Sequence, residues 1–278
     1  MGTTDTERPF GHYRLPPERE RIRAGADTVL GTRLGRWAIS ARRKRSLRGL
    51  AEPFDVAVAP DVNARLYPST NRCEKRATCG VQVWDAEERA ALRDAVRERL
   101  AEPFVFLDIG ANVGLYSLFV SAYAREAGRP SRIVAVEPGA EMGARLRFNA
   151  HASGALVEHV PVAISGEPGE ARLSSGGANR GEGALGETGE PVEVITLLEL
   201  CERHDVSRIH ALKVDIEGHD LPALGAFFRD APENLHPDLL VAELDPANRS
   251  ALIELLHAQN YLLDGATSLN GIFRKNHS

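Results

Sequence analysis

Short apolar runs alternate with helical patterns over most of the chain, and this alternation restricts the fold more than any other feature. The apolar runs cover residues 105–107, 133–136, 157–164, 212–216 and 239–244. Helical spacing of apolar residues follows them in residues 115–122, 140–152, 195–205, 221–228 and 252–256. Apolar strands separated by helices are typical of a parallel sheet buried on both faces. The sequence therefore predicts an α/β fold with five parallel strands.

Two further apolar runs, 261–263 and 272–274, close the chain. Too few residues separate them for a helix, so they must pair as a hairpin. We therefore expect an antiparallel strand at one edge of the sheet.

The first 82 residues have a different character. Residues 1–50 contain helical pieces with poor apolar periodicity, and residues 54–68 alternate on both sides of Pro60-Asp61, which predicts a hairpin. A helix over 85–101 follows, with Asp85 and Glu88 spaced as a capping box. We expect an N-terminal extension over residues 1–82 that contributes to the substrate site (the acceptor site of the reaction inferred below) and a main domain over 83–278.

Charge is unevenly distributed between these two parts. Residues 1–50 hold 12 Lys and Arg against 5 Asp and Glu, a balance of +7, whereas the whole chain carries −5. The basic run 42–45 is either an arm that reaches a phosphate or an acidic partner, or a solvated helix face. The net negative charge makes a nucleic-acid partner unlikely.

Other features of the composition exclude several classes. The chain has no run of 18 apolar residues, so we expect no membrane span, and its polar start predicts no secretory signal. Three cysteines make a disulfide framework improbable, and a cytoplasmic location is expected. A homodimer is left open.

The first chemical motif is DIGANVG, residues 108–114, which turns from a strand into a helix. Gly110 and Gly114 allow a ligand close to the backbone. The motif is neither GxGxxG nor a P-loop, which favours a nucleoside ligand without a diphosphate. Glu137 ends the next strand, where a carboxylate either accepts hydrogen bonds from two ribose hydroxyls or caps the following helix.

Charged residues also end the fourth and fifth strands. Lys213, Asp215 and Glu217 alternate in KVDIEG, and Glu243 ends VAEL. Buried charges are costly unless they are paired or used. Asp215 and Glu243 would together hold a hard cation such as magnesium or share a proton; alternatively, Lys213 and the carboxylates only order the sheet edge.

Residues 165–191 break the alternation and hold eight of the 25 glycines. The segment is either a substrate-gating loop or a surface excursion. Its two ends, 171–173 and 192–194, are expected to pair as a ribbon. We expect this segment to cover strands four and five and residues 1–53 to cross the acceptor entrance.

These motifs together resemble the FkbM family of S-adenosylmethionine-dependent methyltransferases. The resemblance spans residues 83–275 and rests on DIGANVG with Tyr116-Ser117, VEP (136–138), Asn149, KVDIEG with Asp220, VAEL (241–244) and the closing Asn270-Gly-Ile-Phe. It implies a class I methyltransferase sheet, Rossmann-like, of seven strands in the order 3-2-1-4-5-7-6, with helices on both faces.

The resemblance also implies a donor site. The implied contacts to S-adenosylmethionine are Asp108, Gly110, Ala111, Asn112, Gly114, Ser117, Glu137 and Pro138, with Val162 and Ala163 beside the adenine and Asp215 near the methionine part. Family members mostly methylate hydroxyls, so the expected acceptor is a small molecule or a sugar-containing natural product.

An alcohol acceptor needs a base that removes its proton. His219 follows the KVDIEG motif directly and is one possible base; Asp215 and Glu243 are the others. His204 and His210 are interpreted as structural. Two other functions stay open, namely methylation of RNA or protein through the basic arm, and a donor-binding module without catalysis.

Overall fold

The computed structural model describes residues 5–98, 102–174, 184–186, 188–216, 218–267 and 269–276. A seven-stranded sheet forms its centre, with the strand order β5-β4-β3-β10-β11-β13-β12. In that order the strands are Glu158–Val160, Ser131–Val136, Phe104–Ile109, Ala211–Val214, Leu239–Glu243, Asn270–Lys275 and Tyr261–Ala266. When these seven strands are renumbered 1 to 7 in the order in which they follow along the chain, the sheet has the expected order 3-2-1-4-5-7-6. The α/β class I methyltransferase architecture is confirmed.

The antiparallel strand lies one position inside the edge that was expected. β13 pairs antiparallel with both β11 and β12, so β12 forms the edge and runs parallel to the central strands. The short connection makes β12 and β13 antiparallel neighbours, and the pairing of β13 with β11 leaves β12 at the edge.

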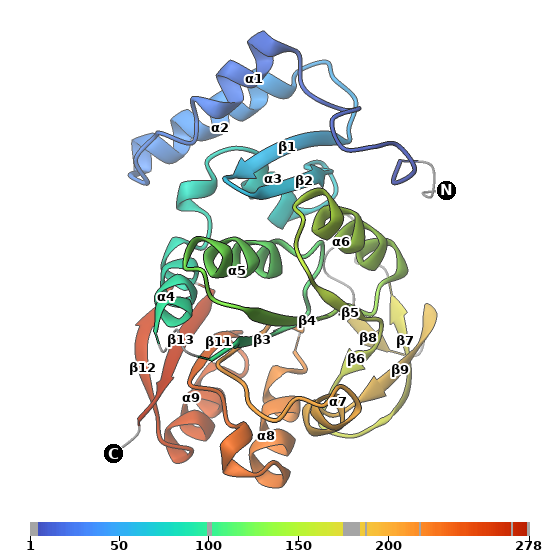
Figure 1. Ribbon diagram of the computed structural model, residues 1–278, viewed down its shortest axis with the longest axis vertical. Helices are drawn as coiled ribbons and strands as arrows, with labels where there is room; N and C mark the ends of the chain where they lie inside the picture. Colours follow the sequence, from blue (N-terminus) through green and yellow to red (C-terminus); the bar gives the residue numbers. More distant parts are fainter. Residues whose placement is uncertain are drawn as a thin grey trace.

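Helices cover both faces of this sheet (Figure 1). α5 (Leu115–Glu126) and α6 (Ala140–Ala152) lie on one face, and α7 (Leu197–Arg203), α8 (Asp220–Asp230) and α9 (Arg249–Ala258) lie on the other. Successive strand residues point to opposite faces. Phe106 accordingly packs into the core beneath α5, and Leu107 packs into the core beneath α8.

The N-terminal extension packs on the α5 and α6 side of the molecule (Figure 1). Its hairpin consists of β1 (Phe54–Ala59) and β2 (Val62–Leu66), followed by α3 (Arg72–Thr78). The predicted hairpin is confirmed. Val56 of β1 belongs to the same apolar core as Leu118 of α5, and Asn149 of α6 accepts a hydrogen bond from the Arg65 N–H at 2.8 Å. The hairpin therefore shares a core with the main sheet's helices.

Two helices of the extension lie farther from the sheet. α1 (Pro17–Ala24) and α2 (Arg33–Leu47) pack together at the end of the molecule beyond the hairpin (Figure 1). The helical pieces expected in residues 1–50 are thus present.

The expected third strand, 157–164, was wrong as a single element. β5 ends at Val160, and Ala163–Ile164 forms β6, which pairs with β9 (Glu190–Ile195) in a second sheet of order β6-β9-β7-β8. Pro161 stands at the break and has no N–H to continue the ladder. β7 (Gly169–Ser174) pairs antiparallel with β9, which confirms the predicted ribbon; β8 is Ala184–Gly186.

The predicted capping box before α4 (Ala86–Arg97) was also wrong. Asp85 has φ 43° and ψ 46° and makes no side-chain cap. Its carboxylate instead accepts the Tyr116 hydroxyl at 3.0 Å, and Glu88 accepts Thr267 and Asn270 side chains. Tertiary partners on α5 and before β13 replace the local cap. Residues 99–101 of the expected helix lie outside the described residues.

No helix in the described part of the chain is long and apolar enough to cross a membrane.

A fully buried ion pair links the hairpin to the start of the chain. Arg65 donates to Asp55 through Nε at 2.7 Å and Nη2 at 2.9 Å, and also to the carbonyls of Asp5, Arg8 and Pro9. Both side chains are at most 1% exposed. Asp55 therefore neutralises a guanidinium that water cannot reach.

We expect Asp55→Ala to lower the free energy of unfolding by ~3–5 kcal/mol, because it leaves this guanidinium buried and unpaired. Asp264→Ala breaks the half-exposed pair with Arg274 and serves as the matched control; it should cost about 1 kcal/mol or less. Urea unfolding measures both values. Equal effects of the two substitutions would contradict the importance of the buried pair.

Candidate active site

A cavity of about 930 Å³ lies at the carboxyl ends of β3, β4, β10 and β11. Ligands of open α/β sheets bind at this edge. Nine of the predicted site residues line the cavity: Gly110, Ala111, Asn112, Glu137, Pro138, Val162, Ala163, Asp215 and Glu243. Asp108, Gly114, Ser117 and His219 are not among its lining residues.

The turn after β3 requires glycine at its first position. Gly110 has φ 74°, and a Cβ there would lie 1.9 Å from the carbonyl oxygen of Asp215. The amides of Gly110 and Ala111 both donate to the carbonyl of Val136, at 3.0 and 2.9 Å. These contacts hold the DIGANVG turn against the ends of β4 and β10. The turn thus forms a fixed backbone wall of the cavity.

Glu137 projects from the end of β4 into the same part of the cavity. Its two carboxylate oxygens accept the amides of Asn112 at 2.9 Å and Gly139 at 2.8 Å. Burial raises the pKa of Glu137 to about 7, although both amides oppose the shift. Each carboxylate oxygen can accept a second hydrogen bond. The side chain therefore retains acceptor capacity toward the cavity.

Asp108 lies behind the cavity wall. It is fully buried and accepts hydrogen bonds from the amide and the hydroxyl of Ser117, at 3.1 and 2.7 Å. Burial raises the pKa of Asp108, and the charge of Lys213 partly opposes that shift. Asp108 and Ser117 thus fix the first turn of α5 rather than face the cavity.

Gly114 serves packing between helices. It precedes α5 with φ 82°, and a Cβ there would lie 2.9 Å from Cγ of Leu146 on α6. The absent side chain allows α5 and α6 to approach each other.

Lys213 connects the DIGANVG turn with the end of β10. Its Nζ donates to the carbonyl of Gly110 at 3.1 Å and lies 3.1 Å from Asp215 and 4.0 Å from Asp108. Burial would lower the pKa of Lys213, but the two carboxylates raise it overall, so the ammonium stays charged.

Of the expected carboxylate pair, Asp215 and Glu243, the first already forms an ion pair with Lys213. Asp215 follows β10 and Glu243 ends the adjacent parallel strand β11, and both line the cavity. The Lys213 ammonium already neutralises Asp215. In the described ranges, no group of three or more His, Cys, Asp or Glu side chains is arranged to hold a metal ion.

His219 is placed away from the cavity wall. It precedes α8, and its Nδ1 lies 3.0 Å from the hydroxyl of Ser165. Its position after KVDIEG suggested a base, but the turn through Gly218 directs the chain to the α8 side of the sheet. His204 and His210 contact Glu158 and the amide of Val105, in keeping with the structural interpretation.

The extension over residues 1–82 was expected to contribute to the acceptor site, but sequence reasoning named none of the residues with which it lines the cavity. Asn71, Arg72, Cys73 and Arg76 line it from α3 and the residue before it, and Trp84, Asp85, Tyr116 and Asn270 line it from three other segments. Asn71 caps α3 by accepting the Glu74 amide at 3.2 Å. This Asn-x-x-Glu spacing was the available signal for a helix start.

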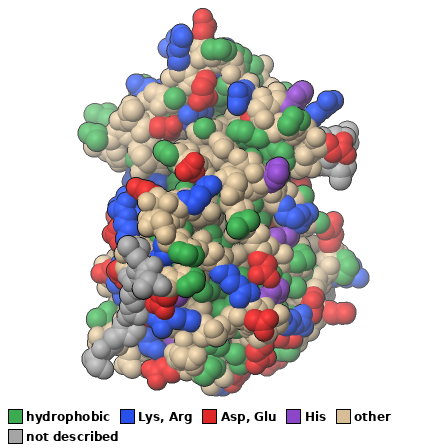
Figure 2. All heavy atoms as spheres, viewed as in Figure 1, with side chains coloured by type: hydrophobic (Ala, Val, Ile, Leu, Met, Phe, Trp, Pro, Cys, Tyr) green, Lys and Arg blue, Asp and Glu red, His purple; other side chains and the backbone are tan. Residues whose placement is uncertain are grey.

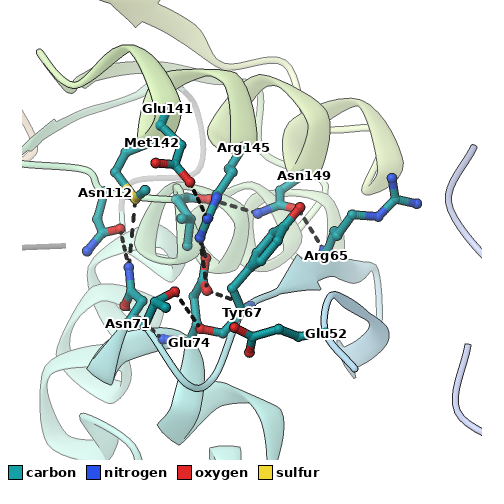
Figure 3. Close-up of polar contacts among 12 residues, drawn as sticks. Glu52, Arg65, Tyr67, Asn71, Glu74, Asn112, Glu141, Met142, Arg145 and Asn149 are labelled. Carbon is teal, nitrogen blue, oxygen red and sulfur yellow. Dashed lines mark hydrogen bonds and ion pairs between the residues drawn. The ribbon is translucent and has the colours of Figure 1, made fainter. Parts of the chain in front are cut away.

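Figure 3 shows how this wall is fixed. The side-chain amide of Asn71 donates from Nδ2 to Oδ1 of Asn112 at 2.9 Å, which joins α3 to the DIGANVG turn (Figure 3). Glu74 is fully buried, and it accepts the Tyr67 amide at 2.6 Å and the Arg145 guanidinium at 3.1 Å. Burial raises the pKa of Glu74 to about 7, against the effect of Arg145. The extension is thereby tied to α6 and to the donor side of the cavity.

The glycine-rich segment reaches the cavity from another side than expected. Leu173, Ser174, Gly189 and Glu190, near its paired ends, line the cavity with Val162 and Ala163. In Figure 1 this sheet lies beyond β5, opposite β12 and β13. Residues 175–183 and 187 lie outside the described residues. Of the described residues 5–53, none lines the cavity, so the expected position of this arm at the entrance was wrong.

The model of the Methyltransferase FkbM domain matches residues 108–263, more than half of the chain. The chain belongs to the FkbM methyltransferase family.

The individual relatives and solved structures that resemble the chain have low sequence identity to it. Hexuronic acid methyltransferase AglP of Haloferax volcanii is 25% identical over 148 residues, which are 51% of this chain and 59% of that protein. Among solved structures, the METTL16 MTase domain is similar over 100% of both chains, at 13% identity and a TM-score of 0.50. Precorrin-6y C5,15-methyltransferase of Geobacter metallireducens covers 69% of this chain and 88% of its own, at 16% identity and a TM-score of 0.43. Only the fold follows from the METTL16 likeness.

We expect Lys213→Met to lower the free energy of unfolding by ~3–5 kcal/mol, because it leaves the buried Asp108 carboxylate without a countercharge. Asp108→Asn combined with Lys213→Met should recover part of this loss, since the buried charge is then absent. Lys75→Met, on the exposed side of α3, is the control. A double variant less stable than Lys213→Met alone would show that Lys213 does not act by charge compensation.

Proposed function

We propose that this methyltransferase transfers the methyl group of S-adenosylmethionine to a hydroxyl of a small molecule or a sugar. The observation that carries the proposal is a single cavity with two unlike halves. One half presents the DIGANVG backbone and the Glu137 carboxylate. The other half presents carboxylates, a phenol and two arginines from α3, the residue before α4, α5 and the ends of β10 and β11.

The first half suits the donor. Glu137 has unused acceptor capacity for two ribose hydroxyls, and Gly110 lets the turn beside it pack closely against the backbone of Asp215. Val162 and Ala163 give an apolar surface beside it, which suits an adenine ring. Asp108, Ser117 and Gly114 support this half indirectly, by fixing the turn and the helix behind it.

The second half suits an alcohol. The bound donor supplies an activated methyl group, so the protein has to position the two partners and accept one proton. Asp215 and Glu243 both line the cavity, and Asp215 forms an ion pair with Lys213.

A sugar acceptor is favoured by two observations. The relative AglP is named as a hexuronic acid methyltransferase. Arg72 and Arg76 stand one turn apart on α3 at the cavity and would accommodate an acidic group on the acceptor.

A macromolecular acceptor has less support, because α2, which carries the basic run, does not line the cavity. On the face shown in Figure 2, basic and acidic side chains are interspersed. A cytoplasmic location and natural-product tailoring stay predictions.

Methyl transfer to a panel of acceptors tests the proposal. The panel contains methyl β-D-glucuronide, methyl β-D-glucoside, a catechol and an RNA hairpin, and the products are read by mass spectrometry. Methyl ethers of the sugars support the proposal, with the glucuronide favoured over the glucoside. Methylation of the RNA alone would overturn it.

The donor role of Glu137 predicts a defined loss of affinity. Glu137→Ala should weaken binding of S-adenosylhomocysteine by roughly 1.5–3 kcal/mol, as expected for hydrogen bonds to a charged group. Because the pKa of Glu137 lies at about 7, wild-type affinity should also fall between pH 8 and pH 6, as the carboxylate becomes protonated. Calorimetry measures both effects. Glu158→Ala, on an exposed residue of β5, is the control. Unchanged affinity in Glu137→Ala would remove Glu137 from the donor site.

A chelator experiment tests the predicted magnesium site. Two carboxylates, one of them paired with Lys213, make a weak ligand set for a cation that prefers six oxygens. We therefore expect methyl transfer to persist in excess chelator. Loss of activity that returns with magnesium alone would show that Asp215 and Glu243 hold a cation.

A further inference from the structure

The residue before α4 combines an unusual backbone with a functional position. Asp85 is a non-glycine residue in the left-handed region, with φ 43°. The φ/ψ of such residues is disfavoured, and they cluster at functional sites. Asp85 also lines the cavity, and it does not cap the helix that follows it. Helix capping therefore does not account for this conformation.

The partner of Asp85 comes from a different element. The Tyr116 hydroxyl donates to Oδ2 of Asp85 at 3.0 Å. Tyr116 also lines the cavity, and its ring packs edge-on against Trp84 with centroids 5.4 Å apart. One oxygen of the carboxylate is thus held by a phenol whose ring is fixed by packing. This arrangement orients the carboxylate without neutralising it.

We propose that Asp85 is the general base that takes the proton from the acceptor hydroxyl, and that Tyr116 positions its carboxylate. This inference rests on the proposed O-methylation. As the acceptor oxygen forms its bond to the methyl carbon, its proton passes to Asp85. The bond between that carbon and the donor sulfur breaks, and the sulfur keeps the electron pair. The products are a methyl ether, S-adenosylhomocysteine and a protonated Asp85.

Asp215 and Glu243 are the two other carboxylates in this half that could accept the proton. Asp215 lies 3.1 Å from the buried Lys213 ammonium and is already held in an ion pair. Glu243 ends the adjacent strand β11 and also lines the cavity, and the variant Glu243→Gln compares its contribution with that of Asp85. Asp85 has an orienting donor and no direct salt bridge within the described residues.

The surroundings of Asp85 set its basicity. Burial raises the pKa of Asp85, and the charge of Glu88 on α4 adds to that shift. The Tyr116 hydrogen bond, Arg76 on α3 and Lys213 on β10 oppose it. Cys73 also faces Asp85 from α3, and burial keeps the pKa of its thiol well above the ordinary value, so it adds no charge. A carboxylate with a raised pKa is a stronger base.

Asp85→Asn tests the proposal, with methyl β-D-glucuronide and methyl β-D-glucoside as acceptor probes. We expect kcat to fall by about 10²–10⁴-fold, the usual contribution of a general base. Affinity for S-adenosylhomocysteine should stay as in the wild type, which shows that the variant folds and keeps its donor half. Asp94→Asn is the matched control, since Asp94 lies exposed on the same helix. Wild-type kcat in Asp85→Asn, or an equal loss in Glu243→Gln alone, would overturn the proposal.

Tyr116→Phe gives a readout that a purely structural role would not change. The Tyr116 hydroxyl favours the charged form of Asp85, so its removal should raise the pKa of Asp85 further. The acidic limb of the kcat profile should then move to higher pH, with a smaller loss of rate at its plateau. An acidic limb that stays in place contradicts a role for Asp85 in that limb.

A titration without acceptor separates this inference from the proposed function. Carbon NMR of labelled aspartate in the complex with S-adenosylhomocysteine follows the Asp85 carboxyl directly, with Asp85→Asn assigning the signal. A pKa that rises in Tyr116→Phe supports the pairing, and an unchanged pKa overturns it. If neither probe is methylated by the wild type, the sugar acceptor fails, and this titration still decides whether Tyr116 and Asp85 are coupled.

Discussion

The buried Lys213 ammonium is the interaction on which the rest of the site depends. It joins the carbonyl of Gly110, the carboxylate of Asp215 and the more distant carboxylate of Asp108 beneath one cavity wall. A fully buried carboxylate is tolerated only with a countercharge and hydrogen bonds, and Asp108 has both through Lys213 and Ser117. The turn after β3 and the end of β10 therefore occupy a fixed relative position before any ligand arrives.

A second buried pair does the same for the opposite wall. Glu74 on α3 and Arg145 on α6 are joined where neither is exposed, and Asn71 links α3 onward to Asn112 in the donor turn. The extension is thus part of the site through buried polar contacts as well as through a shared apolar core. The backbone amide of Asn112 also donates to Glu137, so hydrogen bonds to one residue, Asn112, link the two halves of the cavity.

The sequence predicted the strand order correctly and placed Gly110 and Glu137 at the edge of the sheet where the cavity lies. Gly110 and Glu137 sit at strand ends that periodicity locates, and the order of the strands follows from the resemblance to a known family. Other features depend on contacts that are distant in sequence. Asp85 looked like a cap for its own helix, whereas its partner is Tyr116, 31 residues later. The break at Pro161 was visible in the sequence, yet the apolar run around it outweighed that signal.

The two halves of the cavity are therefore built on different principles. The donor half consists largely of backbone amides and glycines held by the sheet, so its shape is set by the fold itself. The acceptor half consists of side chains from α3, the start of α4, α5 and the segment before β13, which meet only in the folded chain. Substitutions in those segments can alter the acceptor half while the sheet and the donor turn keep their contacts. It follows that the family fold identifies the methyl donor, whereas the acceptor has to be found from the side chains that the extension and α4 bring to the cavity.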